Sequence, residues 1–224
     1  MKKIFIIPLL TSLFAFGQSF VPDAPELNLK SYILIEPNTN TVIAEFNSTS
    51  EIEPASMTKI MTAYVTADQI GNELISIDDE VLISEKAWRM EGSRMFIEAG
   101  KRVSVSDLLK GIIIQSGNDA SVAIAEYVGG TERGFVDLMN AYAGSLNMNN
   151  TIFQNSTGLP AENHFSSAKD LAILTSHLIT KFPEIYSFYK EKQFTFNEIK
   201  QLNRNKLLWR DDSSDGVKTG NTKA

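Results

Sequence analysis

A serine and a lysine three residues apart, Ser56 and Lys59, have the types and spacing of a nucleophile and its base. A serine hydroxyl is a weak nucleophile until a neighbouring group removes its proton. Positions i and i+3 share one face of a helix, so the lysine amine can reach the hydroxyl. The pair alone predicts little, because Ser-x-x-Lys also occurs at Ser166 and Ser187.

Two further motifs, Ser116-Gly117-Asn118 and Lys218-Thr219-Gly220, follow in order, and each motif lies beside an element able to hold it. The first serine precedes an apolar, helix-like run at 60–65. The second motif follows the buried-looking run 112–114 and opens another helix-like run. The third lies in a turn-flanked segment at 215–222. The order and context of the three motifs, rather than any single match, indicate a serine site that needs no histidine.

The segment 53–62 resembles the nucleophile segment of the serine-type D-alanyl-D-alanine carboxypeptidases, the low-molecular-mass penicillin-binding proteins of the peptidase S11 type. The three motifs resemble the signature of penicillin-binding proteins and class A β-lactamases, in which Asp usually stands where this chain has Gly117. The likeness runs from about Lys30 to the last residue, and Asn221 departs from it because the family usually has His there. Further segments are similar to the same family: 92–96, 116–120, 203–209 and 215–220.

The resemblance implies catalytic roles for three side chains and two backbone amides. Ser56 is the expected nucleophile, Lys59 its base, and Ser116 a proton relay between the lysine and the leaving amine. A lysine base must be neutral, which burial and a second nearby cation would both favour, and Lys218 is the expected cation. The backbone amides of Ser56 and Asn221 are the expected oxyanion hole, where the negative charge of a tetrahedral intermediate develops.

The resemblance also implies a set of substrate-binding residues. Asn118 is expected to hold the base and a substrate amide. Lys218 and Thr219 are expected to bind the terminal carboxylate, one by charge and one by its hydroxyl. Gly220 lets the substrate backbone approach closely. Arg204 is expected to assist with the carboxylate, and an ordinary ion pair is an equally good interpretation of this residue.

The implied function is removal of the terminal D-alanine from peptidoglycan stem pentapeptides through an acyl-enzyme on Ser56. β-Lactams are expected to acylate the same serine, and no metal or organic cofactor is implied. A class A-like β-lactamase is the alternative, but it needs a glutamate after the second motif to activate water, and Glu162 is a poor substitute. A truncated, non-catalytic penicillin-binding fragment is a further alternative.

The two ends of the chain predict export and an incomplete domain. Residues 1–17 have the two lysines, apolar stretch and small-x-small site of a cleavable signal peptide, which predicts a periplasmic or cell-envelope location. Residues 18–224 are the expected penicillin-binding, transpeptidase-like domain. Because Ala224 follows Gly220 by only four residues, we expect the C-terminus to be truncated and the chain as it stands to be marginal or inactive.

Composition excludes several classes of function. The chain has no cysteine, so disulfides and cysteine-based metal sites are excluded, and its two histidines are too few for a His-rich metal site. The net charge of −6 argues against nucleic acid as a partner. Association with the inner membrane is expected only through a C-terminal segment that this sequence lacks.

The order of the elements predicts an α+β fold of the β-lactamase/transpeptidase type. Strands come first, helices occupy the middle, and strands return at the end, so we expect an antiparallel sheet made by both chain ends against a central helical region. The expected strands are 31–35, 41–46, 193–196 and 216–222. The expected helices begin near Ser56, after Ser104, after Asn118, at Thr131 and after Ser167.

Overall fold

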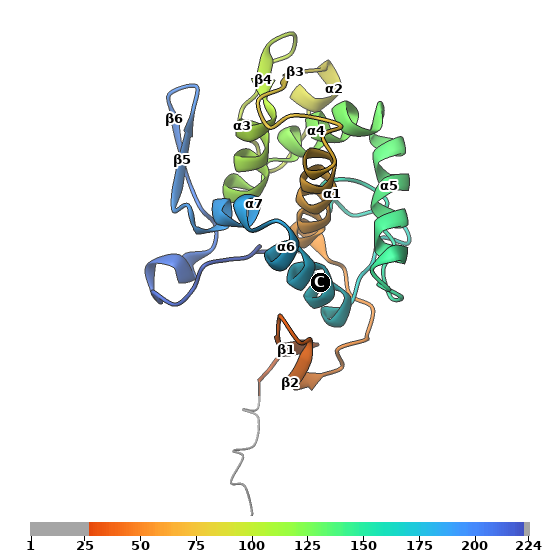
Figure 1. Cartoon of the computed structure of the whole chain (residues 1–224). Helices are drawn as coiled ribbons and strands as arrows, with labels where there is room; N and C mark the ends of the chain where they lie inside the picture. The colour runs from red at the N-terminus through yellow and green to blue at the C-terminus, as the bar shows by residue number, and fades with distance from the viewer. Residues whose placement is uncertain (1–26, 222–224) are drawn as a thin grey trace, which may run out of the picture.

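The computed structural model describes residues 27–221 (Figure 1). The signal peptide expected at 1–17 and its cleavage site lie outside these residues. Seven α-helices occur in the described part: α1 (Lys59–Gly71), α2 (Glu85–Trp88), α3 (Val105–Lys110), α4 (Asn118–Gly129), α5 (Glu132–Ser145), α6 (Ala168–Lys181) and α7 (Pro183–Ser187). Shorter helical turns are η1 (Ala55–Thr58), η2 (Gly111–Gln115), η3 (Phe188–Lys190) and η4 (Lys206–Trp209).

Helix α1 is the centre of the helical region and contacts α4, α5 and α6 (Figure 1). Every residue from Lys59 to Asp68 is buried. Six of these ten residues are apolar, among them Met61, Tyr64 and Val65. The buried polar ones all have hydrogen-bond partners: Lys59, Thr62, Thr66 and Asp68. The base predicted from the sequence therefore lies at the start of the most buried helix of the fold.

The predicted helix boundaries are confirmed by their caps. The side-chain oxygens of Ser104, Thr131 and Ser167 each accept a hydrogen bond from a backbone amide in the first turn of α3, α5 and α6. These bonds satisfy amides that have no partner within the helix. Helix α4 ends at Gly129, and Gly130 adopts the left-handed conformation (φ 70°) that favours glycine at a helix C-terminus.

Three separate two-stranded antiparallel sheets surround the helices. They are β1 (Tyr32–Glu36) with β2 (Thr41–Phe46), β3 (Glu80–Leu82) with β4 (Arg102–Ser104), and β5 (Gln193–Phe196) with β6 (Ile199–Leu202). The first hairpin contacts α6, whereas the last stands against η2 on another side (Figure 1). The α+β class and the first three expected strands, at 31–35, 41–46 and 193–196, are thus confirmed.

The structure corrects one expectation: the two chain ends do not form a common sheet among the described residues. Residues 216–221 have no regular secondary structure. Within residues 27–221, β1 and β2 pair with each other and with no other strand. A β-strand is stabilised by backbone hydrogen bonds to a neighbouring strand, and no described strand lies beside this segment. Side chains hold it instead, because Asn205 Nδ2 donates to Gly216 O at 2.8 Å. No helix in the described part has the length and apolar character needed to cross a bilayer.

Candidate active site

A cleft of about 740 Å³ brings the three sequence motifs together. Its lining contains Ser56, Ser116, Asn118, Arg204, Thr219, Gly220 and Asn221, all of which the sequence singled out, together with Thr157–Pro160, Gly92, Ser93 and Lys206. Residues more than 150 positions apart in the chain thus share one surface. Both amides expected for the oxyanion hole, those of Ser56 and Asn221, belong to residues of this lining.

The nucleophile turn is η1, which runs directly into α1. Ser56 is half-buried there, and its hydroxyl makes no helix-capping hydrogen bond, so capping does not occupy it. Its Oγ lies 3.5 Å from Lys59 Nζ. Gly220 packs against this turn, since a Cβ at its position would meet Pro54 O at 3.2 Å. The third motif therefore lies directly beside the nucleophile.

The two competing Ser-x-x-Lys pairs are not in the cleft. Ser166 is fully buried, and its Oγ is hydrogen-bonded to Thr151 Oγ1 at 2.8 Å. Ser187 is exposed at the end of α7, where its hydroxyl donates to Glu184 O. Of the three serines, only Ser56 lines the cleft that the other motifs share.

Lys59 is fully buried, and its amine has three oxygen neighbours. Nζ lies 2.7 Å from Asn118 Oδ1, 2.5 Å from Thr157 O and 3.5 Å from Ser56 Oγ. A neutral amine has two N–H donors and one lone pair. The two short contacts take both donors, which leaves the lone pair for the hydroxyl of the nucleophile.

Burial is the main reason why the pKa of the Lys59 amine lies well below its usual value. The charge of Lys218 lowers it further, Asp119 opposes this shift, and Arg204 adds a smaller lowering effect. Partial burial, and then the Arg204 guanidinium, lower the pKa of Lys218 itself to about 7. These surroundings favour the neutral amine that a base requires.

Arg204 has no ion pair among residues 27–221. Its Nε donates to Gln115 O at 3.0 Å, beside the second motif, and its side chain is exposed along the cleft. The ordinary ion pair considered for this residue is therefore absent from the described part. The guanidinium remains available to an anionic group in the cleft.

The second motif lies between η2 and α4. Ser116 is buried and has a left-handed backbone (φ 66°). Asn118 begins α4, and its Nδ2 donates to Glu91 O at 2.7 Å, which turns Oδ1 toward Lys59. The next residue, Asp119, accepts hydrogen bonds from the amides of Met95 and Phe96 and so fastens the segment that follows Ser93.

Thr157 and Gly158 are site residues that the sequence analysis missed. Thr157 contributes only its main-chain carbonyl to Lys59, and any residue type supplies a carbonyl. Gly158 has φ +81°, and a Cβ there would lie 1.8 Å from Ala55 O, so only glycine lets this loop lie against the nucleophile turn. The one available signal was the Gly and Pro content of 155–160, which is typical of any turn.

His164 supports the nucleophile turn from behind. It is buried, its Nδ1 accepts from Gln154 N at 3.2 Å, and its Nε2 lies 2.9 Å from Thr58 Oγ1. With Nδ1 accepting, the ring is neutral and Nε2–H donates to the threonine. Burial lowers the pKa of His164 to about 4.

We expect His164 to make the protein less stable as the pH falls from about 6.5 to 4. In this range the unfolded histidine binds a proton and the folded one does not, so each step down in pH favours unfolding. The full effect is up to about 3 kcal/mol. Urea unfolding between pH 4 and 7 measures it. His164→Asn should lose this part of the pH dependence, and His177→Asn should keep it; equal pH dependence in His164→Asn and the parent would contradict the assignment.

Comparison with known proteins shows the family to which the chain belongs. The family model described as D-alanyl-D-alanine carboxypeptidase, peptidase S11, matches residues 18–224. The chain belongs to this family. It is 45% identical over 215 residues to the D-alanyl-D-alanine carboxypeptidase DacC of Escherichia coli K12, which covers 93% of this chain and 54% of that protein. It is 44% identical to DacA of the same organism, over 92% of this chain and 53% of that protein.

Solved structures give the same fold. Penicillin-binding protein 5 from Haemophilus influenzae superposes with a TM-score of 0.87 at 41% identity, covering 90% of this chain and 60% of that chain. Penicillin-binding protein 6B from Escherichia coli has a TM-score of 0.87 at 42% identity, covering 91% of this chain and 67% of that chain. The β-lactamase/transpeptidase-like fold expected from the sequence is confirmed. The chain spans about half the length of the curated relatives it matches.

Proposed function

We propose that this chain carries the catalytic site of a serine D-alanyl-D-alanine carboxypeptidase. The observation that carries the proposal is the buried Lys59 amine, whose two short hydrogen bonds leave its lone pair for Ser56. The substrate is the terminal D-Ala-D-Ala of a peptidoglycan stem peptide, and the relatives' name, D-alanyl-D-alanine carboxypeptidase, supports the D-Ala-D-Ala end. The predicted signal peptide at 1–17 supports action outside the cytoplasm, where such peptides occur.

Acylation begins when neutral Lys59 takes the proton of the Ser56 hydroxyl. The oxygen forms a bond to the carbonyl carbon between the two D-alanines, and the carbonyl oxygen becomes an oxyanion beside the amides of Ser56 and Asn221. The carbon–nitrogen bond then breaks. The leaving amine receives a proton from Lys59 by way of the Ser116 hydroxyl, and free D-alanine departs. An ester on Ser56 remains.

Deacylation replaces the ester by a carboxylic acid. A water molecule gives a proton to the neutral Lys59 amine and attacks the ester carbon. The bond to the serine oxygen breaks, and that oxygen recovers the proton. The enzyme returns to its starting state, and the shortened stem peptide leaves with a carboxylate at its new end.

The preference for a free C-terminus follows from Arg204, which lines the cleft, and from Lys218, which precedes the lining residue Thr219. Arg204 and Lys218 lie close enough for the guanidinium to lower the pKa of the amine. A substrate carboxylate beside them, with the Thr219 hydroxyl as a further donor, would relieve this repulsion between like charges. Binding of an anionic end group is therefore favoured over binding of a neutral one.

β-Lactams are proposed to acylate Ser56 because their strained amide occupies the same place as the scissile bond. A more distant relative, penicillin-binding protein D2 of Listeria monocytogenes, has been solved in cefotaxime-bound and ampicillin-bound forms, at 27% identity in each case. The class A β-lactamase alternative needs a glutamate that activates water beside the ester. Glu162 is exposed and has no hydrogen bond to Ser56 or Lys59.

We therefore expect the protein to release D-alanine from a stem pentapeptide much faster than it hydrolyses penicillin, by about 10²-fold or more. The reason is that the amine released when the β-lactam ring opens stays covalently attached to the acyl group. In addition, no glutamate among the described residues that line the cleft activates the water that would hydrolyse the ester. A coupled assay for free D-alanine and a spectrophotometric assay for penicillin hydrolysis, on one preparation, measure the ratio. Rapid, repeated turnover of penicillin would favour the β-lactamase instead.

A further inference from the structure

The loop 155–160, which gives Lys59 one of its two acceptors, is fastened from within and from outside. Within the loop, Asn155 Oδ1 accepts hydrogen bonds from the amides of Thr157 and Gly158 at 3.1 and 2.7 Å. It also accepts from the Thr157 hydroxyl at 3.0 Å. These bonds fix the shape of the turn, but they do not fix its distance from α1, because every partner moves with the loop.

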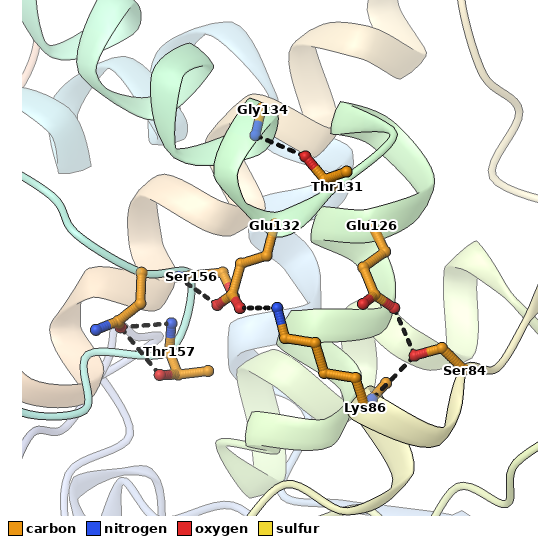
Figure 2. Close-up of polar contacts among 10 residues, drawn as sticks. Ser84, Lys86, Glu126, Thr131, Glu132, Gly134, Ser156 and Thr157 are labelled. Carbon is orange, nitrogen blue, oxygen red and sulfur yellow. Dashed lines mark hydrogen bonds and ion pairs between the residues drawn. The ribbon is translucent and has the colours of Figure 1, made fainter.

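The outer attachment is the carboxylate of Glu132, the first residue of α5 (Figure 2). Its Oε1 accepts from Ser156 Oγ at 3.0 Å and from Ser156 N at 3.3 Å. Its Oε2 accepts from Lys86 Nζ of α2 at 2.7 Å. Ser156 is fully buried, whereas the lysine side chain is about half exposed, so the bonds to the serine are the better shielded half of the network.

Glu132 is itself held in place by the start of its helix. Thr131 caps α5 by accepting from Gly134 N at 3.0 Å, and this fixes the direction in which the glutamate leaves the backbone (Figure 2). On the other side of the turn, Ser156 O accepts from Thr62 Oγ1 of α1 at 2.7 Å. Ser156 is therefore held between α5 and α1, directly before the residue whose carbonyl meets Lys59.

We propose that Glu132 is a positioning residue for the base: by holding Ser156, it fixes the Thr157 carbonyl that occupies one N–H of Lys59. The proposal rests on the role given above to Lys59. Without this acceptor the amine is free to rotate, and its lone pair spends less time directed at the Ser56 hydroxyl. Small displacements of groups around a reacting atom lower rates by factors of ten to a hundred.

The test compares three variants of the protein, each assayed by acylation with a fluorescent penicillin. Glu132→Ala removes the acceptor for both Ser156 donors. Glu132→Gln keeps an acceptor oxygen for Ser156 but loses the charge that pairs with Lys86. Glu126→Ala is the matched control, because Glu126 accepts from Ser84 Oγ at 2.6 Å in the same region and its hydrogen bond goes to α2's cap rather than to the loop (Figure 2).

We expect Glu132→Ala to be acylated about tenfold or more slowly than the parent, with the same final stoichiometry of label. Glu132→Gln and Glu126→Ala should remain within a factor of about three. A purely structural defect would reduce the labelled fraction rather than the rate of each folded molecule. Parent-like rates in Glu132→Ala, or equal losses in Glu132→Ala and Glu126→Ala, would overturn the proposal.

Hydrogen exchange gives a second result that does not depend on penicillin. Backbone amides at 155–159 should exchange faster in Glu132→Ala than in the parent and in Glu126→Ala, because the loop has lost its attachment to α5 and keeps only the bond from Thr62 of α1. Unchanged exchange in this loop would overturn the proposal whatever the acylation rates. If the parent is not acylated at all, the proposed function fails, and the exchange experiment still decides whether Glu132 holds the loop.

Discussion

Lys59→Met should be acylated by penicillin about 10²- to 10⁴-fold more slowly than the parent, because the variant has no base to take the proton of Ser56. Methionine is preferred to alanine, since Lys59 is fully buried and its removal would leave a cavity in α1. The measurement is the second-order rate constant of acylation, together with the circular dichroism spectrum as a check on the fold.

Lys169→Met is the control for this substitution. Lys169 also stands three residues after a serine, but it is exposed and lies outside the cleft. This variant should be acylated at the parental rate. A parental rate in Lys59→Met would mean that another group is the base, and the role of Ser116 and Asn118 would then need a different explanation.

Gly158→Ala should lose about 3 kcal/mol of stability or more, and its acylation should be largely abolished. The backbone at this position is left-handed, which costs an alanine about 1–2 kcal/mol. The added Cβ would also lie 1.8 Å from Ala55 O, so the loop or the nucleophile turn must move. Because both carry parts of the site, Ser56 and the Thr157 carbonyl would separate from Lys59.

Gly144→Ala is the matched glycine variant. Gly144 lies inside α5, and a Cβ there would meet nothing within 4 Å. Because alanine favours a helix more than glycine does, this variant should be up to about 1 kcal/mol more stable than the parent. Urea unfolding and acylation are measured on both variants. Equal stability of Gly158→Ala and the parent would show that the loop is not confined by the nucleophile turn.

The side chains of the site could be predicted from the sequence because their chemistry depends on residue type. Lys59 lies within hydrogen-bonding range of both Ser56 and Asn118, as the motifs indicated. The helix caps were predictable for the same reason, since a serine or threonine before a helix satisfies a free amide. Residue type was sufficient to predict a feature wherever a single side chain makes the interaction with residues close to it in the sequence.

The remaining features depend on which parts of the chain lie together. Thr157 acts through its main-chain carbonyl, which no residue type marks. Glu132 acts on Ser156, 24 positions away, and a glutamate at a helix start normally needs no further partner. The strand expected at 216–222 was wrong because alternating residues do not make a strand without a neighbour, and no described strand lies beside 216–221.

The most direct test of the central claim is to find which residue a labelled penicillin acylates. The protein is treated with the label and digested, and the labelled peptide is sequenced by mass spectrometry. We predict one label per molecule, on Ser56, and none on the Ser56→Ala variant. A label on Ser166 or Ser187, or no label at all, would contradict the assignment of Ser56 as the nucleophile.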